Sequence, residues 1–210
     1  MSSRAVAEIL RSLAAAMNER GLRWYLFGAQ AAIIWGSPRL SADVDVTAQI
    51  GPAAMDEYTA AMLDHGFELI AADSDFVART RVLPFLHRVS GMPLDVVLAG
   101  PGLEEDFLER AISVDVDGVL VPVITPEDLI VTKILAGRAK DIEDIRSVIH
   151  ERSASLDIER VRSVLGLLER ALSQSDLLPV FENEWQNRDP GAPATVVAER
   201  KPMAKPKKKK

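Results

Sequence analysis

Two aspartates separated by one residue, Asp43 and Asp45, form the most chemically suggestive pair in the sequence. The apolar residues around them predict a strand over 44–47, in which alternate residues share one face about 6.5–7 Å apart. A third acid, Asp95, interrupts the apolar run 94–98, where an unpartnered buried carboxylate would be costly. Three such carboxylates could share a divalent cation, and oxygen ligands favour Mg²⁺ or Mn²⁺. Two-metal phosphoryl transfer requires a trio of this kind.

A strand that ends in glycine and continues as a helix precedes the acidic pair. The apolar run 24–27 predicts the strand, Gly28 ends it, and Ala29 begins a short alanine-rich helix. Backbone N–H groups at such a junction can bind phosphate. Arg39 and Ser41 follow and add a cation and a hydroxyl beside the same acids. This context favours a phosphate-handling site over the alternative, in which the acidic pair is a solvated strand end.

The composition excludes several other kinds of site. The chain has no cysteine, which rules out disulfides, thiolate zinc sites, iron–sulfur clusters and cysteine nucleophiles. Its three histidines are scattered along the sequence, so we do not expect a multi-histidine metal site. No apolar run approaches the length of a membrane span, and the first residues lack a signal-peptide core. We therefore expect a cytoplasmic protein with no membrane partner.

The formal net charge of −6 hides an asymmetry along the chain. Residues 200–210 contain seven lysines and arginines and no acid. Removing these seven from the 25 basic residues leaves 18 against 31 acidic ones, a net charge of −13 for residues 1–199. An acidic body repels polyanions, so any contact with nucleic acid must be local or aided by the basic tail or a metal.

Hydrophobic periodicity and turn residues predict an α+β fold with a mixed sheet and a helical C-terminal part. The expected helices cover 4–19, 29–35, 52–64, 103–112, 126–136, 140–151, 157–173 and 176–187. The expected strands cover 24–27, 44–47, 67–70, 79–89, 94–98, 114–116 and 119–124. The corresponding domains are an α/β core over 1–125, a C-terminal helical part over 126–188 and a disordered basic tail over 189–210.

Two blocks of the sequence resemble the DNA polymerase β-like nucleotidyltransferases. They are similar in particular to the AbiEii/AbiGii-type branch, the toxin halves of type IV toxin–antitoxin pairs. The first block reads Tyr25-Leu-Phe-Gly28-Ala29-Gln30-Ala31, followed by Arg39-x-Ser41-x-Asp43-Val-Asp45. The second block reads Pro126-Glu127-Asp128-x4-Lys133-x4-Arg138-x-Lys140-Asp141-x2-Asp144.

The resemblance implies a nucleotidyltransferase-fold mixed β-sheet flanked by helices, and it implies roles by position. The metal ligands would be Asp43, Asp45 and Asp95. The catalytic residues would be Asp43, Asp45, Asp95, Lys133 and Asp141. The nucleotide-binding residues would be Gly28, Ala29, Arg39, Ser41, Lys133 and Arg138. Asp95 would assist the acceptor hydroxyl, Lys133 would contact phosphate, and Asp141 with Arg138 and Asp144 would complete the pocket.

The same resemblance implies a nucleoside triphosphate as substrate, Mg²⁺ or Mn²⁺ as cofactor, tRNA as an acceptor and a cognate antitoxin as a partner. One position departs from the pattern, because Ala29 stands where the branch has glycine or serine and so supplies no hydroxyl. Two alternatives stay open, and only the second of them follows from Ala29. One is a small-molecule nucleotidyltransferase, which the acidic body would suit, and the other is a nucleotide-binding regulatory module of the same fold without turnover.

Overall fold

A computed structural model describes residues 3–70 and 74–188, and these form two compact units. The first unit contains residues 3–26, 42–70 and 74–124, and the second contains residues 27–41 and 125–188. The sequence placed 27–41 in the α/β core, whereas the structure groups this segment with the C-terminal helices. The disordered tail predicted over 189–210 lies outside the described residues.

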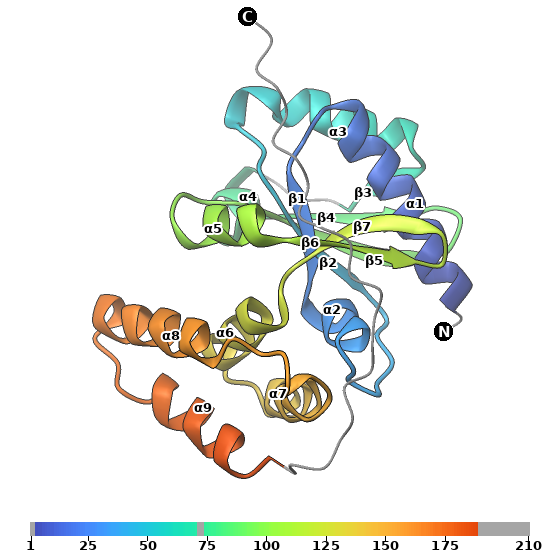
Figure 1. The fold of residues 1–210 in the computed structure, drawn as a ribbon. Helices are drawn as coiled ribbons and strands as arrows, with labels where there is room; N and C mark the ends of the chain where they lie inside the picture. Colours follow the sequence, from blue (N-terminus) through green and yellow to red (C-terminus); the bar gives the residue numbers. More distant parts are fainter. Residues whose placement is uncertain (1–2, 71–73, 189–210) are drawn as a thin grey trace, which may run out of the picture. The chain divides into compact units, whose positions relative to one another are not determined.

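The first unit is built on a mixed seven-stranded sheet with the order β3-β4-β5-β2-β1-β7-β6 (Figure 1). The pairs β2/β5 and β1/β7 are parallel, while β3/β4, β4/β5 and β6/β7 are antiparallel. The mixed sheet flanked by helices that the sequence predicts is therefore confirmed. The strands are β1 (Trp24–Phe27), β2 (Val44–Ala48), β3 (Phe67–Leu69), β4 (Val82–His87), β5 (Met92–Leu98), β6 (Ile112–Val116) and β7 (Val119–Val123).

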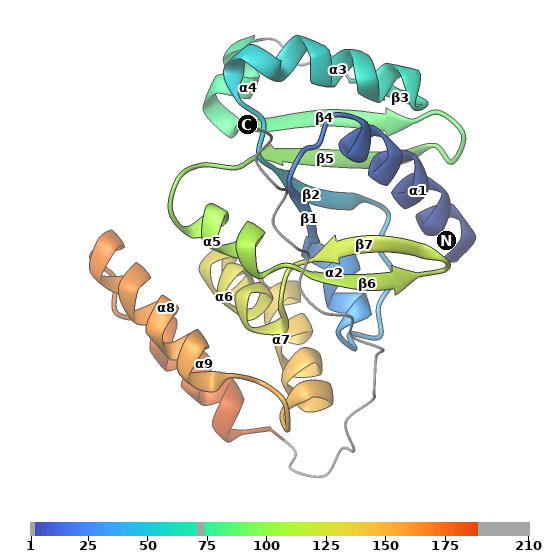
Figure 2. The same ribbon diagram turned by 45° about the horizontal axis from the view of Figure 1, so that its top comes forward.

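Helices α1 and α3 cover one face of this sheet (Figure 2). Tyr58 of α3 packs edge-to-face on Phe85 of β4, with ring centroids 6.1 Å apart. Ser12 of α1 lies 3.2 Å from Nε2 of His87, two residues further along the same strand. Alternate strand residues share a face, so both helices cover the face that carries these two side chains. The helical elements of this unit are α1 (Ser3–Glu19), the short 3₁₀ helix η1 (Pro52–Ala54), α3 (Met55–Asp64), α4 (Ser74–Thr80) and α5 (Leu103–Arg110).

One predicted strand is wrong at its start. The sequence favoured a strand over 79–89, but Ser74–Thr80 forms α4 and β4 begins at Val82. Arg81 separates the two elements with a positive φ of 57°, a conformation that ends the helix and that a regular strand does not contain.

The second unit is a helical cluster centred on α6. Its helices are α2 (Gly28–Ile34), α6 (Pro126–Ala136), α7 (Ala139–Arg152), α8 (Ile158–Leu172) and α9 (Leu177–Gln186). Helix α6 contacts each of the other four (Figure 1). Leu129, Ile130 and Val131 are consecutive and fully buried, as expected for a helix surrounded on all sides. The Thr125 hydroxyl accepts a hydrogen bond from the Asp128 N–H at 3.2 Å and caps α6.

Within the described part of the chain, every helix is too short or too polar to cross a membrane.

The Tyr58 hydroxyl is buried and has no hydrogen-bond partner among the described residues. Removing a buried, unpaired hydroxyl while keeping the ring should therefore stabilise the protein. We expect Tyr58→Phe to raise the free energy of unfolding by about 1 kcal/mol, measured by urea denaturation. Tyr58→Leu is the control and should lower it, because that change also removes the ring contact with Phe85. A Tyr58→Phe protein less stable than wild type would contradict this reading.

Candidate active site

The acidic residues predicted from sequence meet in the first unit. In the parallel pairing of β2 with β5, Asp45 lies directly beside Asp95. Residues paired in this way point to the same face, with backbones about 4.8 Å apart. Their neighbours Val44 and Leu94 are fully buried and face the opposite side. Because Leu94 pairs with Phe85 on β4, that opposite side is the one covered by α1 and α3. The two aspartates thus occupy the other face of the sheet.

Asp43 belongs to the same acidic group. It lies two residues before Asp45, and its charge acts on Asp95. Burial and then the negative charge of Asp43 both raise the pKa of Asp95 above its ordinary value of 3.8. Asp95 is half-buried on its strand, while Asp43 is exposed. Mutual repulsion among these carboxylates makes the group a favourable place for a cation.

The chemistry of this acidic group fits a hard divalent ion, because carboxylate oxygens are the preferred ligands of Mg²⁺ and Mn²⁺. Over residues 3–70 and 74–188, however, no three acidic or histidine side chains converge in the geometry of a preformed metal site. The backbone register therefore brings the donors side by side without a finished ligand set. Their assignment as metal ligands stays a prediction.

The predicted phosphate-binding junction begins α2. Gly28 adopts a φ of +66°, which L side chains rarely adopt, so the junction between β1 and α2 favours glycine here. Ala29 follows and is 8% exposed. Ser41 is half-buried at the end of the segment that includes this helix. With seven residues, α2 provides few aligned peptide dipoles, so a phosphate here would depend on individual N–H groups.

A buried ionic network in the second unit collects the basic residues predicted from sequence. Asp144 is 1% exposed and is its centre. Its Oδ2 accepts hydrogen bonds from Lys133 Nζ at 2.6 Å and from Arg39 Nη1 at 2.7 Å. Its Oδ1 accepts a hydrogen bond from the hydroxyl of Ser37 at 2.8 Å. The network joins α6, α7 and the turn after α2.

Asp141 extends the network toward the start of α7. It is fully buried, and Lys133 Nζ donates to its Oδ1 at 3.2 Å. Arg138 binds it through two nitrogens, with Nε 2.5 Å from Oδ2 and Nη2 3.1 Å from Oδ1. Burial acts to raise the pKa of Asp141, but the hydrogen bonds and charges of Arg138 and Lys133 outweigh it and hold this pKa below 3.8. Asp141 therefore holds Lys133 and Arg138 as an anion, and its assignment as a catalytic residue stays a prediction.

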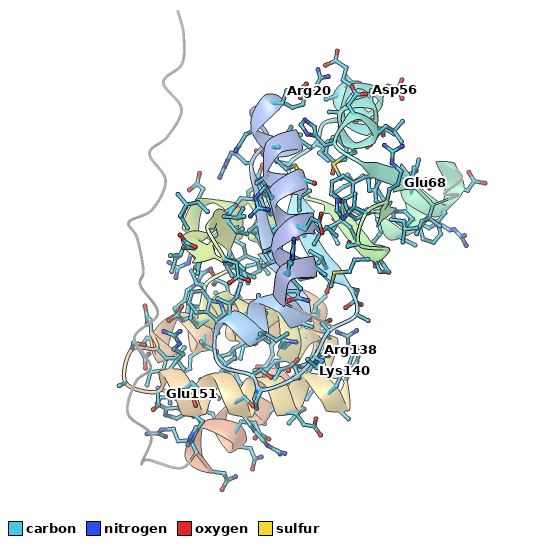
Figure 3. The ribbon with its side chains drawn as sticks, turned by 90° about the vertical axis from the view of Figure 1, so that its right-hand side faces the viewer. Arg20, Asp56, Glu68, Arg138, Lys140 and Glu151 are labelled. Carbon is cyan, nitrogen blue, oxygen red and sulfur yellow. The ribbon has the colours of Figure 1, made fainter. Side chains whose placement is uncertain are left out.

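The network is a chain of alternating charges that runs Arg39, Asp144, Lys133, Asp141, Arg138. Three cations surround two anions, so the group carries an excess of one positive charge. Both arginines reach solvent, with side chains 27% and 61% exposed for Arg39 and Arg138. Figure 3 shows Arg138 together with Lys140 at the beginning of α7. The buried charges are thus compensated within the network, and a partly exposed arginine lies at each end of it.

Gly137 explains how residues eight apart meet. It has a left-handed φ of 63° and ends α6, so Lys133 and Asp141 lie on two different helices. The helices predicted over 126–136 and 140–151 leave a gap at this glycine, and the structure likewise ends one helix at Ala136 and begins the next at Ala139. The contact between the two side chains survives because the helices pack against each other.

The turn after α2 is fixed on one face of α7. Ser37 and Arg39 of this turn bind Asp144. In addition, the guanidinium of Arg152 lies over the ring of Trp35, 5.1 Å from its centroid. Gly36 has a φ of 119°, and a Cβ there would lie 2.5 Å from Cγ of Glu151. Residues 144, 151 and 152 share one side of a helix, so α7 holds this turn along two of its own turns. The sequence did not predict that Ser37 binds Asp144. The turn residues Gly36-Ser37-Pro38 were the signal that could have pointed to it.

The first two acids of the second sequence block, Glu127 and Asp128, form contacts between helices. Glu127 Oε1 accepts a hydrogen bond from the N–H of Asp157 at 3.0 Å, just before α8. Asp128 is fully buried and forms a 2.9 Å ion pair with Arg160 of α8. These contacts connect α6 to the beginning of α8, so this part of the motif maintains the helical cluster.

The fold that presents these groups is that of the nucleotidyltransferases. It is similar to the fold in the solution structure of the antibiotic-resistance factor ANT(2'')-Ia. The TM-score is 0.56, with 16% sequence identity, and the match covers 82% of this chain and 95% of that one. It is also similar to an antigenic nucleotidyltransferase-like protein from Paracoccidioides brasiliensis, with a TM-score of 0.56 and 17% identity over 90% and 95%. A crystal structure of ANT(2")-Ia in complex with adenylyl-2"-tobramycin gives a TM-score of 0.53 and 16% identity over 88% and 99%. Likeness at these identities establishes the fold.

Residues 10–187 match the family described as "Nucleotidyltransferase of unknown function (DUF6036)", and the chain belongs to that family. The resemblance to the nucleotidyltransferase superfamily is thereby confirmed. No curated protein sequence matches the chain.

Lys133 should be essential for stability because it is 4% exposed and separates two buried carboxylates. Removing one partner of a buried ionic group typically costs about 3–5 kcal/mol. We expect Lys133→Met to lower the free energy of unfolding by that amount in urea denaturation. Lys140→Met, at an exposed position in the same region, is the matched control and should change it by less than about 0.5 kcal/mol. Equal stability of the two variants would contradict a compensating role for Lys133.

Proposed function

We propose that this chain transfers a nucleoside monophosphate from a nucleoside triphosphate to an acceptor hydroxyl. The observation that carries the proposal is the pairing of Asp45 with Asp95, together with the charge of Asp43 acting on Asp95. In the reaction, the acceptor oxygen forms a bond to the α-phosphorus while the bond from that phosphorus to the β-phosphate oxygen breaks. Pyrophosphate leaves with the electron pair of the broken bond.

Asp95 is the group we propose to receive the proton of the acceptor hydroxyl. The strand register places Asp95 directly beside Asp45, so an acceptor hydroxyl bound at the acidic group would lie within its reach. Asp43 and Asp45 would hold Mg²⁺ or Mn²⁺ together with Asp95. When bound, such an ion lowers the pKa of the attacking hydroxyl and neutralises the charge that develops on the phosphates.

The basic and backbone groups would bind the triphosphate. We assign this role to the N–H groups of Gly28 and Ala29, the hydroxyl of Ser41, and the side chains of Arg39 and Arg138. A direct contact of Lys133 with phosphate stays a prediction. The position of Lys133 between two buried aspartates favours a supporting role, in which it compensates the anions that hold the two arginines.

Loss of one acid should remove activity and leave the fold intact. We expect Asp43→Asn and Asp95→Asn to reduce transfer by about 10²–10⁴-fold, because each change removes a charge from the reacting group. Transfer is measured with α-³²P-labelled nucleoside triphosphates, MgCl₂ and total tRNA, and the fold is monitored by circular dichroism. Asp56→Asn, at an exposed position on α3, is the matched control and should transfer normally. Equal labelling by wild type, Asp43→Asn and Asp95→Asn would defeat the assignment.

We further propose that the acceptor is the 3′ hydroxyl of tRNA and that the protein is the toxin half of a type IV toxin–antitoxin pair. The support is the likeness of both sequence blocks to the AbiEii/AbiGii-type branch. A cationic small molecule is the second candidate acceptor. It is favoured by the net charge of −13 over residues 1–199 and by the fold likeness to ANT(2")-Ia, whose structure contains adenylyl-2"-tobramycin.

A direct competition between acceptors separates these candidates. With labelled triphosphates, MgCl₂, total tRNA and tobramycin in one reaction, we expect label on tRNA. Expression in bacteria should arrest growth, and Asp43→Asn should abolish the arrest. Label on tobramycin alone would support the small-molecule acceptor instead. Binding of nucleotide without any labelled product would favour the regulatory module that Ala29 suggests.

A further inference from the structure

We propose that Asp144 is a positioning residue that fixes the guanidinium of Arg39 for binding the phosphates of the nucleoside triphosphate. This inference rests on the proposed function and deepens it, because it assigns a role to a residue that touches no substrate. Asp144 is 1% exposed and accepts hydrogen bonds from three side chains, at distances of 2.6–2.8 Å. One of these donors is Arg39, whose side chain also reaches solvent.

The geometry leaves Arg39 able to bind a ligand while it is held. A guanidinium has five N–H donors in one plane, and Asp144 engages Arg39 through its Nη1. The donors on the other nitrogens point along different directions of that plane. Planar guanidinium groups match the oxygens of phosphate in pairs, so a fixed plane selects a fixed phosphate position.

Arg39 is held at its backbone as well as at its head. The Arg39 N–H donates to the Ser37 carbonyl at 2.9 Å, and the Ser37 N–H donates to the Ala32 carbonyl at 2.8 Å. The Ser37 hydroxyl in turn donates to Asp144, so one carboxylate orders both the turn and the arginine. A free arginine loses much rotamer freedom when it binds a ligand. Here that freedom is already lost in the fold, which increases the affinity for the ligand.

Lys133 explains why Arg39 keeps a charge for the ligand. An isolated aspartate would neutralise the one arginine that it holds. Asp144 instead shares Oδ2 between Lys133 Nζ at 2.6 Å and Arg39 Nη1 at 2.7 Å. Lys133 is buried and helps to compensate Asp144, so this carboxylate does not depend on Arg39 alone. The guanidinium of Arg39 is partly exposed and can therefore also bind an anionic ligand.

A double-mutant cycle on nucleotide affinity tests this role. Dissociation constants for ATP, CTP, GTP and UTP are measured by calorimetry in MgCl₂, and the tightest binder is used. We expect Arg39→Ala and Asp144→Asn each to weaken binding about tenfold, the scale of one charge-assisted hydrogen bond. The double variant should bind as weakly as Arg39→Ala alone, because Asp144 acts through the arginine. A purely structural role would not produce this coupling.

Asp141→Asn is the matched control. Asp141 is a buried carboxylate that shares Lys133, but its arginine partner is Arg138 rather than Arg39. Any loss of affinity from this variant should therefore add to that of Arg39→Ala. Ser37→Ala provides a milder test if Asp144→Asn does not fold, because it keeps every charge. It should weaken binding about threefold, and that effect should vanish in the Arg39→Ala background.

The outcomes separate this inference from the proposed function. If wild type binds nucleotide but Asp144→Asn or Ser37→Ala weakens binding equally with and without Arg39, the positioning role is overturned and the proposed function stands. If Asp144→Asn folds and binds as wild type does, the positioning role is likewise overturned. If wild type binds none of the four nucleotides, the proposed function itself fails.

Discussion

A carboxylate can be buried only when hydrogen-bond donors and opposite charge surround it, and this constraint divides the aspartates of the protein into two groups. Asp144 and Asp141 satisfy it completely within the second unit, through Lys133 and the two arginines at the ends of the network. Asp95 in the first unit does not reach that state, because burial and the charge of Asp43 both act against its ionised form. Asp144 and Asp141 therefore maintain structure, whereas Asp95 keeps an unfavourable negative charge that a bound cation would compensate under the proposed function.

The same distinction applies to the acidic residues of the second sequence block, most of which have structural contacts. The second sequence block contains five acids between positions 127 and 144, and four of them have structural partners. Glu127 binds the N–H of Asp157 just before α8, and Asp128 pairs with Arg160. The other two are Asp141 and Asp144 of the ionic network. The oxygens of these acids already accept hydrogen bonds from neighbouring side chains and backbone groups. What they provide is the fixed position of the basic groups beside them.

The sequence predicted most elements because their signals are local. The cap formed by Thr125 and Pro126, the stop at Gly137 and the strand 24–27 all depend on neighbouring residues. It failed at α4, because the predicted strand began at Arg79 and no helix was assigned to 74–80, although Ser74 and Asp75 are residues that favour a helix start. Contacts between residues far apart in the chain could not be predicted from the sequence. Strand alternation fixed which side chains share a face, but the register that pairs Asp45 with Asp95 depends on tertiary packing.

The discontinuous second unit has a consequence for biosynthesis. Ser37 is separated by 107 residues from its partner Asp144. Ribosomes add about 5–20 residues per second, so the segment 27–41 waits roughly 5–20 s before its docking helix has been translated. All seven strands of the sheet are complete in the chain before that moment, since β7 ends at Val123. The nascent polypeptide can thus form its acidic face first, and Ser37 and Arg39 can bind Asp144 only after α7 has been translated.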